Sequence, residues 1–257
     1  MLTNIMMAVT SHPQDPAREV EFNEWYTRNH VPDVLNAPGW RHAVRYKLAK
    51  ATAGDVSPYL ALYQVDHDDV EAAETTLMKH LASPLPWRIP MPPATPPAQG
   101  GLVPLDVRAY FRKTLEVGRN DQSPENAPKA VMVVQTHPAR GAPVQPMNKW
   151  YDGHVADVIR MPGFRGAARY ERIDMKTGYA SPYLAVYELE TDDVEKVAQD
   201  VAKQAELAYA RDESSLFYGS VGWMPTTAGG ERWVQVDGFA YFTLVSAPSK
   251  VPTLVAV

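Results

Sequence analysis

The chain has 257 residues, of which 45% are hydrophobic and 21% charged, and its formal net charge is -5 at pH 7. This composition is typical of a globular protein with one large or two small domains, and it lacks the basic excess that nucleic acid or anionic lipid would require. The sequence contains no cysteine, which excludes disulfides, thiolate catalysis and cysteine-ligated metals. Since signal-peptide and membrane-span patterns are also missing, we expect a cytoplasmic protein that binds neither membrane nor nucleic acid.

The first predicted strand, residues 5–13, is rich in methionine and β-branched residues and ends at His12 and Pro13, where proline stops a strand. A helix is predicted over residues 23–34. Pro38 and Gly39 then mark the turn into an alternating strand over residues 40–48.

A third strand is predicted over residues 57–65, and Asp68 and Asp69 are placed to cap a second helix. A last strand follows at residues 106–111. The order β-α-β-β-α-β is that of a ferredoxin-like unit. Such a unit leaves one face of its sheet apolar and uncovered by helices.

The second half of the chain repeats these segments in the same order. Residues 5–13, 57–63, 68–71 and 106–111 match residues 130–138, 181–187, 192–195 and 237–242. Four matched blocks indicate an internal duplication. We therefore expect an α+β protein in which two ferredoxin-like repeats pack sheet to sheet as a closed barrel. The expected parts are an N-terminal repeat at 1–113, a linker at 114–128 and a C-terminal repeat at 129–257.

A proline-rich stretch, residues 83–101, separates the second helix of the first repeat from its last strand. Proline stiffens such a segment into extended chain. It is interpreted either as a surface connection or, because it carries Trp87, as a lid over a pocket or an oligomer contact. A homodimer of the whole chain is left open.

Two histidine–aspartate pairs are the main candidates for chemistry. His30 with Asp33, and His154 with Asp157, stand three residues apart at the polar end of an otherwise apolar helix face. A carboxylate beside an imidazole fixes its tautomer and raises its basicity, which suits a general base. The alternative is a brace for the helix end. Pro32 removes one helical hydrogen bond and predicts a kink in the first repeat.

The remaining candidates are aromatic and histidine side chains on the strands and the first helix of each repeat. The full catalytic set is His30, Asp33, His154, Asp157, Tyr46 and Tyr170. The substrate-binding set is His12, Trp25, Tyr26, Tyr63, Trp87, His137, Trp150 and Tyr187. Each also has a structural interpretation, as a turn residue or as a core aromatic with a satisfied hydroxyl.

Arg45 and Arg169 precede the matched strand tyrosines and could pair with an acidic substrate or, more commonly, with a carboxylate of the helix. No nucleotide-binding loop, nucleophile elbow or zinc-protease motif is present. A metal site across His12, His30 and Asp33 has no diagnostic spacing, so we predict no metal.

The run Asn-x-Trp-Tyr-x-x-(x)-His-Val-x-Asp-Val, followed by Pro-Gly-aromatic and Arg-Tyr, resembles the EthD-like proteins of the dimeric α/β-barrel superfamily. The resemblance covers both repeats and implies two ferredoxin-like units packed sheet to sheet. It also implies a pocket between each sheet and its own helices, where histidine and tyrosine conduct acid–base chemistry. The second repeat departs from the pattern at Gly153 and has one residue fewer before His154.

Members of that superfamily include cofactor-independent monooxygenases, polyketide cyclases, isomerases, lyases and haem-binding enzymes. We expect a lyase or cyclase that needs no cofactor and acts by proton transfer on a small aromatic or polyketide-like compound. His30 or His154 would be the base, the neighbouring aspartate its orienting group and a tyrosine the donor to an oxyanion. The alternatives are an oxygenase, cofactor-free or haem-dependent, and a non-catalytic small-molecule-binding protein.

Overall fold

The computed structural model describes residues 5–86, 88–93, 101–118 and 126–246. In this part of the chain eight strands close into an antiparallel barrel in the order β1-β3-β2-β8-β5-β7-β6-β4. The strands are β1 (Ile5–Ser11), β2 (Trp40–Ala53), β3 (Tyr59–Val65), β4 (Leu105–Gly118), β5 (Ala130–Pro138), β6 (Phe164–Thr177), β7 (Tyr183–Leu189) and β8 (Val234–Ser246).

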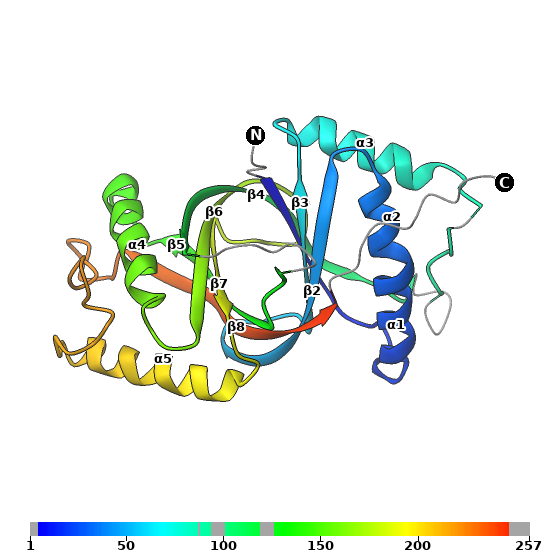
Figure 1. Cartoon of the computed structure of the whole chain (residues 1–257). Helices are drawn as coiled ribbons and strands as arrows, with labels where there is room; N and C mark the ends of the chain where they lie inside the picture. The colour runs from blue at the N-terminus through cyan, green and yellow to red at the C-terminus, as the bar shows by residue number, and fades with distance from the viewer. Residues whose placement is uncertain (1–4, 87, 94–100, 119–125, 247–257) are drawn as a thin grey trace.

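The helices cover the outside of the barrel in two groups (Figure 1). On one side lie η1 (Pro16–Arg18), α1 (Glu19–Trp25), η2 (Tyr26–His30), α2 (Val31–Asn36) and α3 (Val70–Ala82). On the other side lie α4 (Val144–Val158) and α5 (Val194–Tyr209). The aspartate caps are confirmed, since Asp69 accepts from the backbone N–H groups of Glu71 and Ala72, and Asp193 accepts from that of Lys196. None of the described helices is both long and apolar enough to cross a membrane.

The apolar side chains form three clusters, which follow from the alternation of side chains along each strand. The barrel interior is filled from both halves, for example by Met6, Leu62, Val133 and Phe242. The opposite faces of the strands pack under α1–α3 in the first half and under α4 and α5 in the second. The expected α+β barrel, closed by both halves of the chain, is confirmed.

One expected boundary differs from the structure. The first repeat was bounded at residue 113 with a linker from 114, but β4 continues to Gly118 and pairs with β6 along this stretch. The residues here alternate, with Leu115 and Val117 at intermediate positions and Thr114 and Glu116 exposed, as on a strand with one face in water. Residues 119–125 of the expected linker lie outside the described residues.

Two glycines sit where the halves join. Gly54 ends the β2 hairpin beside the backbone of Asp237, and Gly178 ends the β6 hairpin beside the backbone of Asp106. Both have a positive φ, and a Cβ atom at either position would collide with the facing carbonyl oxygen. Glycine is therefore required for the hairpins to approach the opposite half so closely.

Candidate functional site

Each helical layer contains a tryptophan stacked on a histidine. The rings of Trp150 and His154 are 4.9 Å apart at 13°, and those of Trp25 and His30 are 5.1 Å apart at 16°. Tyr151 and Tyr26 meet the same histidines edge-on. The two halves therefore build the same aromatic arrangement around a histidine.

The first half reaches this arrangement with one more residue. Between α1 and α2 the chain forms a π-helical segment, η2, in which the Val31 N–H donates to the Tyr26 carbonyl, five residues back. Trp25 and His30 are five residues apart in the sequence, whereas Trp150 and His154 in α4 are four residues apart. The wider π-helical turn therefore accommodates the extra residue. The kink was expected at Pro32, whereas the wider turn lies just before it; Pro32 is the second residue of α2, which continues η2 with helical backbone angles.

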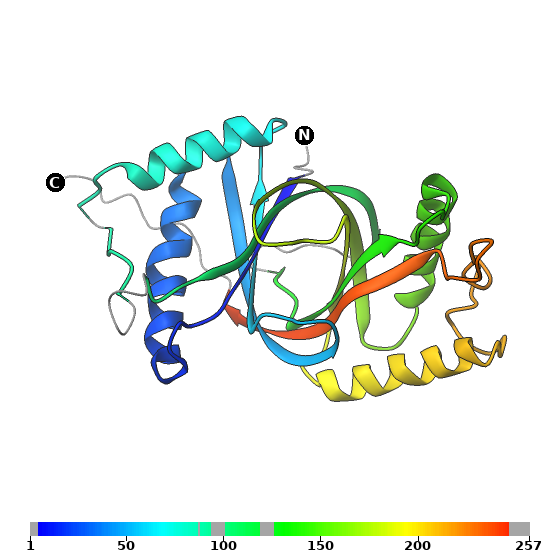
Figure 2. The same ribbon diagram turned by 180° about the vertical axis from the view of Figure 1, so that it is seen from behind.

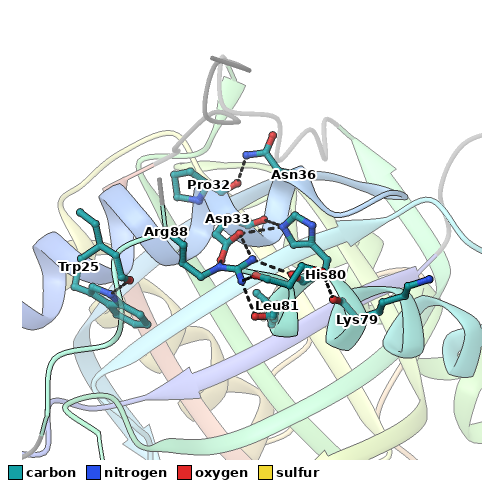
Figure 3. Close-up of polar contacts among 10 residues, drawn as sticks. Trp25, Pro32, Asp33, Asn36, Lys79, His80, Leu81 and Arg88 are labelled. Carbon is teal, nitrogen blue, oxygen red and sulfur yellow. Dashed lines mark hydrogen bonds and ion pairs between the residues drawn. The ribbon is translucent and has the colours of Figure 1, made fainter. Parts of the chain in front are cut away.

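Asp33, which the sequence analysis expected to orient His30, makes its hydrogen bonds with His80 and Arg88 instead (Figure 3). Its Oδ1 lies 2.9 Å from His80 Nε2, and Arg88 donates to both oxygens at 2.5 and 3.0 Å. Arg88 also donates to the carbonyls of Leu81 and His80. The carboxylate thus fastens the stretch after α3 to α2, and its effect on His30 is through space.

Asp157 likewise anchors a loop to a helix in the second half. Its Oδ2 accepts from the Ser220 N–H at 2.7 Å and from the Ser220 hydroxyl at 3.1 Å, and Arg160 lies 3.1 Å from Oδ1. Residues 210–233, which we name the cap segment, are thereby held over α4 (Figure 2, orange). The cap segment also accepts a hydrogen bond from Trp150 Nε1 at the Gly222 carbonyl, 3.2 Å away.

A cavity of 260 Å³ lies between α4, α5, the cap segment and the outer face of the second half of the barrel. Its wall is mainly apolar and aromatic and includes His154, Tyr151, Tyr187, Phe217, Trp223 and Phe239. Among the described residues His154 Nδ1 is buried and has no hydrogen-bond partner. We name this space the His154 pocket; His30 lines neither this pocket nor the two other best-defined cavities of the described residues.

Burial lowers the pKa of His154 to about 4, and the negative charge of Asp157 opposes this shift only in part. The pKa of His30 is also lowered to about 4, mainly by burial and further by Arg45 and Arg88. Both imidazoles are therefore neutral at pH 7, and the one in the His154 pocket has a ring nitrogen free to accept a proton.

The expected tyrosine donors are distributed over two faces of the barrel. Tyr46 and Tyr170 point into the barrel interior, so the prediction that they share a pocket with the histidines is corrected. Tyr187 lines the His154 pocket, and Tyr63 packs under the helices of the first half. Burial raises the pKa of Tyr187 well above its usual range.

Tyr151 is one of the pocket residues that the sequence analysis did not select. It was visible as the second aromatic of the repeated Trp-Tyr pair, but only its neighbour Trp150 was chosen. Burial also raises the pKa of Tyr151, so the phenols of Tyr151 and Tyr187 stay protonated at neutral pH. Trp87 lies outside the described residues.

His12 and His137 lie at strand ends, away from the stacked histidines. His12 Nδ1 is 2.8 Å from Asp106, and His137 Nδ1 is 2.7 Å from Asp237, which also accepts from the Ser181 hydroxyl. Neither lines the His154 pocket. Within the described ranges no group of three or more histidine, aspartate and glutamate side chains could hold a metal ion.

Arg45 and Arg169 are buried beneath the first helix of each half. Arg169 pairs with Asp152 of α4 at 2.9 Å, which confirms the commoner of the two expected pairings. Arg45 donates to Asn23 and Thr27 and lies over the Tyr26 ring. These arginines fix the helices to the sheet.

No known protein-family model matches the chain. Core atranone cluster (CAC) protein 1 of Stachybotrys chlorohalonatus (strain IBT 40285) is 28% identical over 163 residues, 62% of this chain and 64% of that protein. The chain thus matches less than two thirds of that relative's length.

Several solved structures share the fold. An anthrone oxidase-like protein superposes with a TM-score of 0.59 at 12% identity, covering 99% of this chain and 97% of its own. A candidate monooxygenase from Fusobacterium nucleatum gives 0.52 at 8% identity, with 97% and 96% covered. A dye-decolorizing peroxidase from Bacteroides thetaiotaomicron gives 0.51 at 10% identity, with 96% and 94% covered. At these identities the likeness concerns the fold alone.

Proposed function

We propose that this protein is an enzyme that moves protons on a small aromatic or polyketide-like substrate in the His154 pocket, as a lyase or cyclase that needs no cofactor. Two observations carry the proposal: His154 lines an apolar cavity, and its buried Nδ1 has no hydrogen-bond partner among the described residues. A mainly apolar pocket with few polar groups is typical of small-molecule sites.

The base would act by taking a proton from a carbon that is conjugated with a carbonyl group. The C–H bond breaks, its electron pair stays on the substrate as an enolate, and the proton goes to His154 Nδ1. Burial opposes the resulting imidazolium, but Asp157 and the new substrate anion both stabilise it. Tyr187 and Tyr151 are protonated in this pocket and are the candidates to donate to the enolate oxygen.

The proposed reaction takes place in the second half of the chain. His30 has the same aromatic neighbours as His154 but lines none of the described cavities. His154 is therefore the proposed base, and His30 is its structural counterpart in the first half of the chain.

We further infer that the two halves are ferredoxin-like units of one duplicated, EthD-like chain. The barrel order supports this, since it consists of β4-β1-β3-β2 followed by β8-β5-β7-β6, the same order twice. The matched sequence blocks and the shared tryptophan–histidine stacks support it as well.

A second candidate function is an oxygenase that uses the same proton abstraction. The fold likeness to an anthrone oxidase-like protein and to a candidate monooxygenase favours it. In this reaction the carbanion formed by His154 would react with dioxygen, so that anthrone plus O₂ gives anthraquinone plus water. The two candidates differ only in what happens after the proton has been removed.

Anthrone separates the two candidates experimentally. In deuterated buffer without oxygen, NMR follows exchange of its methylene hydrogens above the buffer rate, which reports proton abstraction alone. Admitting oxygen then shows whether anthraquinone forms. We expect His154→Gln to lose 100-fold or more of the exchange rate, on the order of a general base's contribution, and His30→Gln to retain it.

The proposal fails if both folded variants exchange at the wild-type rate. If anthrone binds and returns without exchange, and His154→Gln loses affinity only, the protein is a binding protein. An absorbance spectrum of the purified protein tests the haem alternative. A Soret band would show bound haem and would contradict the cofactor-free mechanism.

A further inference from the structure

The barrel interior contains a second cavity, of 320 Å³, on the opposite face of the sheet from the His154 pocket. Its apolar wall is contributed by both halves of the chain and includes Leu60, Leu62, Phe111, Val133, Val186 and Phe242. This volume lies within the range of small-molecule sites. Barrels of this size are normally filled by their own side chains, so an interior space of this volume calls for an occupant.

The cavity has an entrance between two hairpins. Asp55 and Ser57 line it from the β2–β3 hairpin, and Tyr179 and Ser181 line it from the β6–β7 hairpin. Tyr179 is 64% exposed, so the lining extends from the barrel core to the surface of the protein. A small molecule can therefore enter without opening the strand pairs.

Polar groups lie among the apolar lining residues. Thr10 Oγ1 is buried and, among the described residues, has no hydrogen-bond partner, which is costly for a hydroxyl. Gln135 lines the same cavity and lies against Gly238, where a side chain would meet its amide group. The residues that line this cavity thus include one with a hydroxyl and one with a carboxamide.

The charge at this end of the barrel selects against anions. Asp237 lines the cavity, but its two oxygens are occupied by His137 and Ser181. Asp55 adds a second carboxylate at the entrance. An anionic ligand would be repelled, whereas a neutral hydroxyl or carbonyl group matches Thr10 and Gln135.

We propose that the barrel cavity is a second small-molecule site, which binds a neutral and largely apolar compound carrying one hydroxyl or carbonyl group, such as a phenol. The ligand's apolar body fills the space between the two halves, and its polar group satisfies Thr10. This site is separate from the His154 pocket and does not depend on the reaction proposed there.

The probe for this site is 4-bromophenol, whose bromine can be located by anomalous scattering in soaked crystals of the full chain. We expect a bromine peak inside the barrel cavity. In solution, calorimetric titration should show that Thr10→Val weakens the barrel-site affinity about five-fold, as the loss of one hydrogen bond does. Ala8→Phe should abolish that binding by filling the cavity.

The matched control is Ala205→Phe, which places the same ring in the His154 pocket instead. It should leave the barrel site intact. A bromine found only outside the barrel overturns the proposal, as does an affinity that neither Thr10→Val nor Ala8→Phe changes. If Ala8→Phe fails to fold, as judged by circular dichroism, the wild-type crystals and the nearly isosteric Thr10→Val still decide the question.

Discussion

At the scale of single residues, burial changes the protonation of the two stacked histidines. An exposed histidine has a pKa near 6.5, whereas burial lowers the pKa of both His30 and His154 to about 4. Above pH 6.5 both the folded and the unfolded chain carry them neutral. Between pH 6.5 and 4 these histidines are protonated in the unfolded chain but not in the folded chain. The free energy of unfolding therefore falls as the pH falls.

We therefore expect His154→Phe to reduce the acid sensitivity of the fold. One pKa unit corresponds to about 1.4 kcal/mol, and 1 kcal/mol to about 2–4 °C in Tm for a chain of this size. From pH 7.5 to 4.5 the wild-type Tm should fall several degrees further than that of the variant. Calorimetry at a series of pH values measures this, and parallel curves for the two proteins would contradict it.

Arg88 is the second residue whose role can be isolated. It is mostly buried and holds the buried carboxylate of Asp33, whereas Arg41 makes an exposed pair with Asp66. Removing one partner of a buried pair leaves an uncompensated charge, so Arg88→Ala should cost about 3 kcal/mol. Arg41→Ala should cost less than about 1 kcal/mol. Urea unfolding compares the two, and equal losses would mean that the Asp33 pair does not anchor the segment after α3.

At the scale of elements, the π-helical segment η2 explains how two helices of different length present the same pair of rings. The sequence shows the repeated Trp-Tyr and His-Val motifs, and it also shows the one-residue difference between them. It does not show where the extra residue goes. Spacing alone would turn His30 away from Trp25, yet the wider turn brings the rings back to 5.1 Å.

This explanation predicts opposite results for two single-residue deletions. Deleting the exposed Arg28 should convert η2 to an α-helical turn and keep the stack at the four-residue spacing of α4, with a Tm within a few degrees of wild type. Deleting Gly153 should reduce the separation of Trp150 and His154 from four positions to three, with two residues between them, and break their stack. Thermal melts and the tryptophan fluorescence of each variant test this; a larger loss on deleting Arg28 would refute the equivalence of the two helices.

Only some of the contacts in the site could be predicted from the sequence. The helix carrying each histidine was predictable from its repeated motif, but the partners of the aspartates were not. Arg88 and Ser220 lie 55 and 63 residues away along the chain and reach Asp33 and Asp157 only through the fold. The tyrosines were ambiguous for another reason: both faces of this sheet are apolar, so alternation could not assign Tyr46 to the barrel interior and Tyr63 to the helices.

At the scale of the whole molecule, the repeated blocks predicted a barrel closed by both halves because each sheet needs a cover for its apolar face. The sequence could not show that the long strands continue past their own half, as β2 does against β8 and β4 does against β6. These two seams join the halves. They also bring Gly54 and Gly178 against the backbone of the opposite half.

The seams can be tested by adding one methyl group at Gly178. Gly178 and Gly141 both have a positive φ, of 67° and 82°, so alanine at either position costs about 1–2 kcal/mol in backbone conformation. At Gly141 nothing lies within 4 Å of the added Cβ, whereas at Gly178 it would collide with the Asp106 carbonyl. Because a backbone oxygen cannot move aside as a flexible side chain can, Gly178→Ala should cost a further ~1–3 kcal/mol. Urea unfolding measures the difference, and equal losses for the two variants would show that the β4–β6 seam tolerates separation at this end.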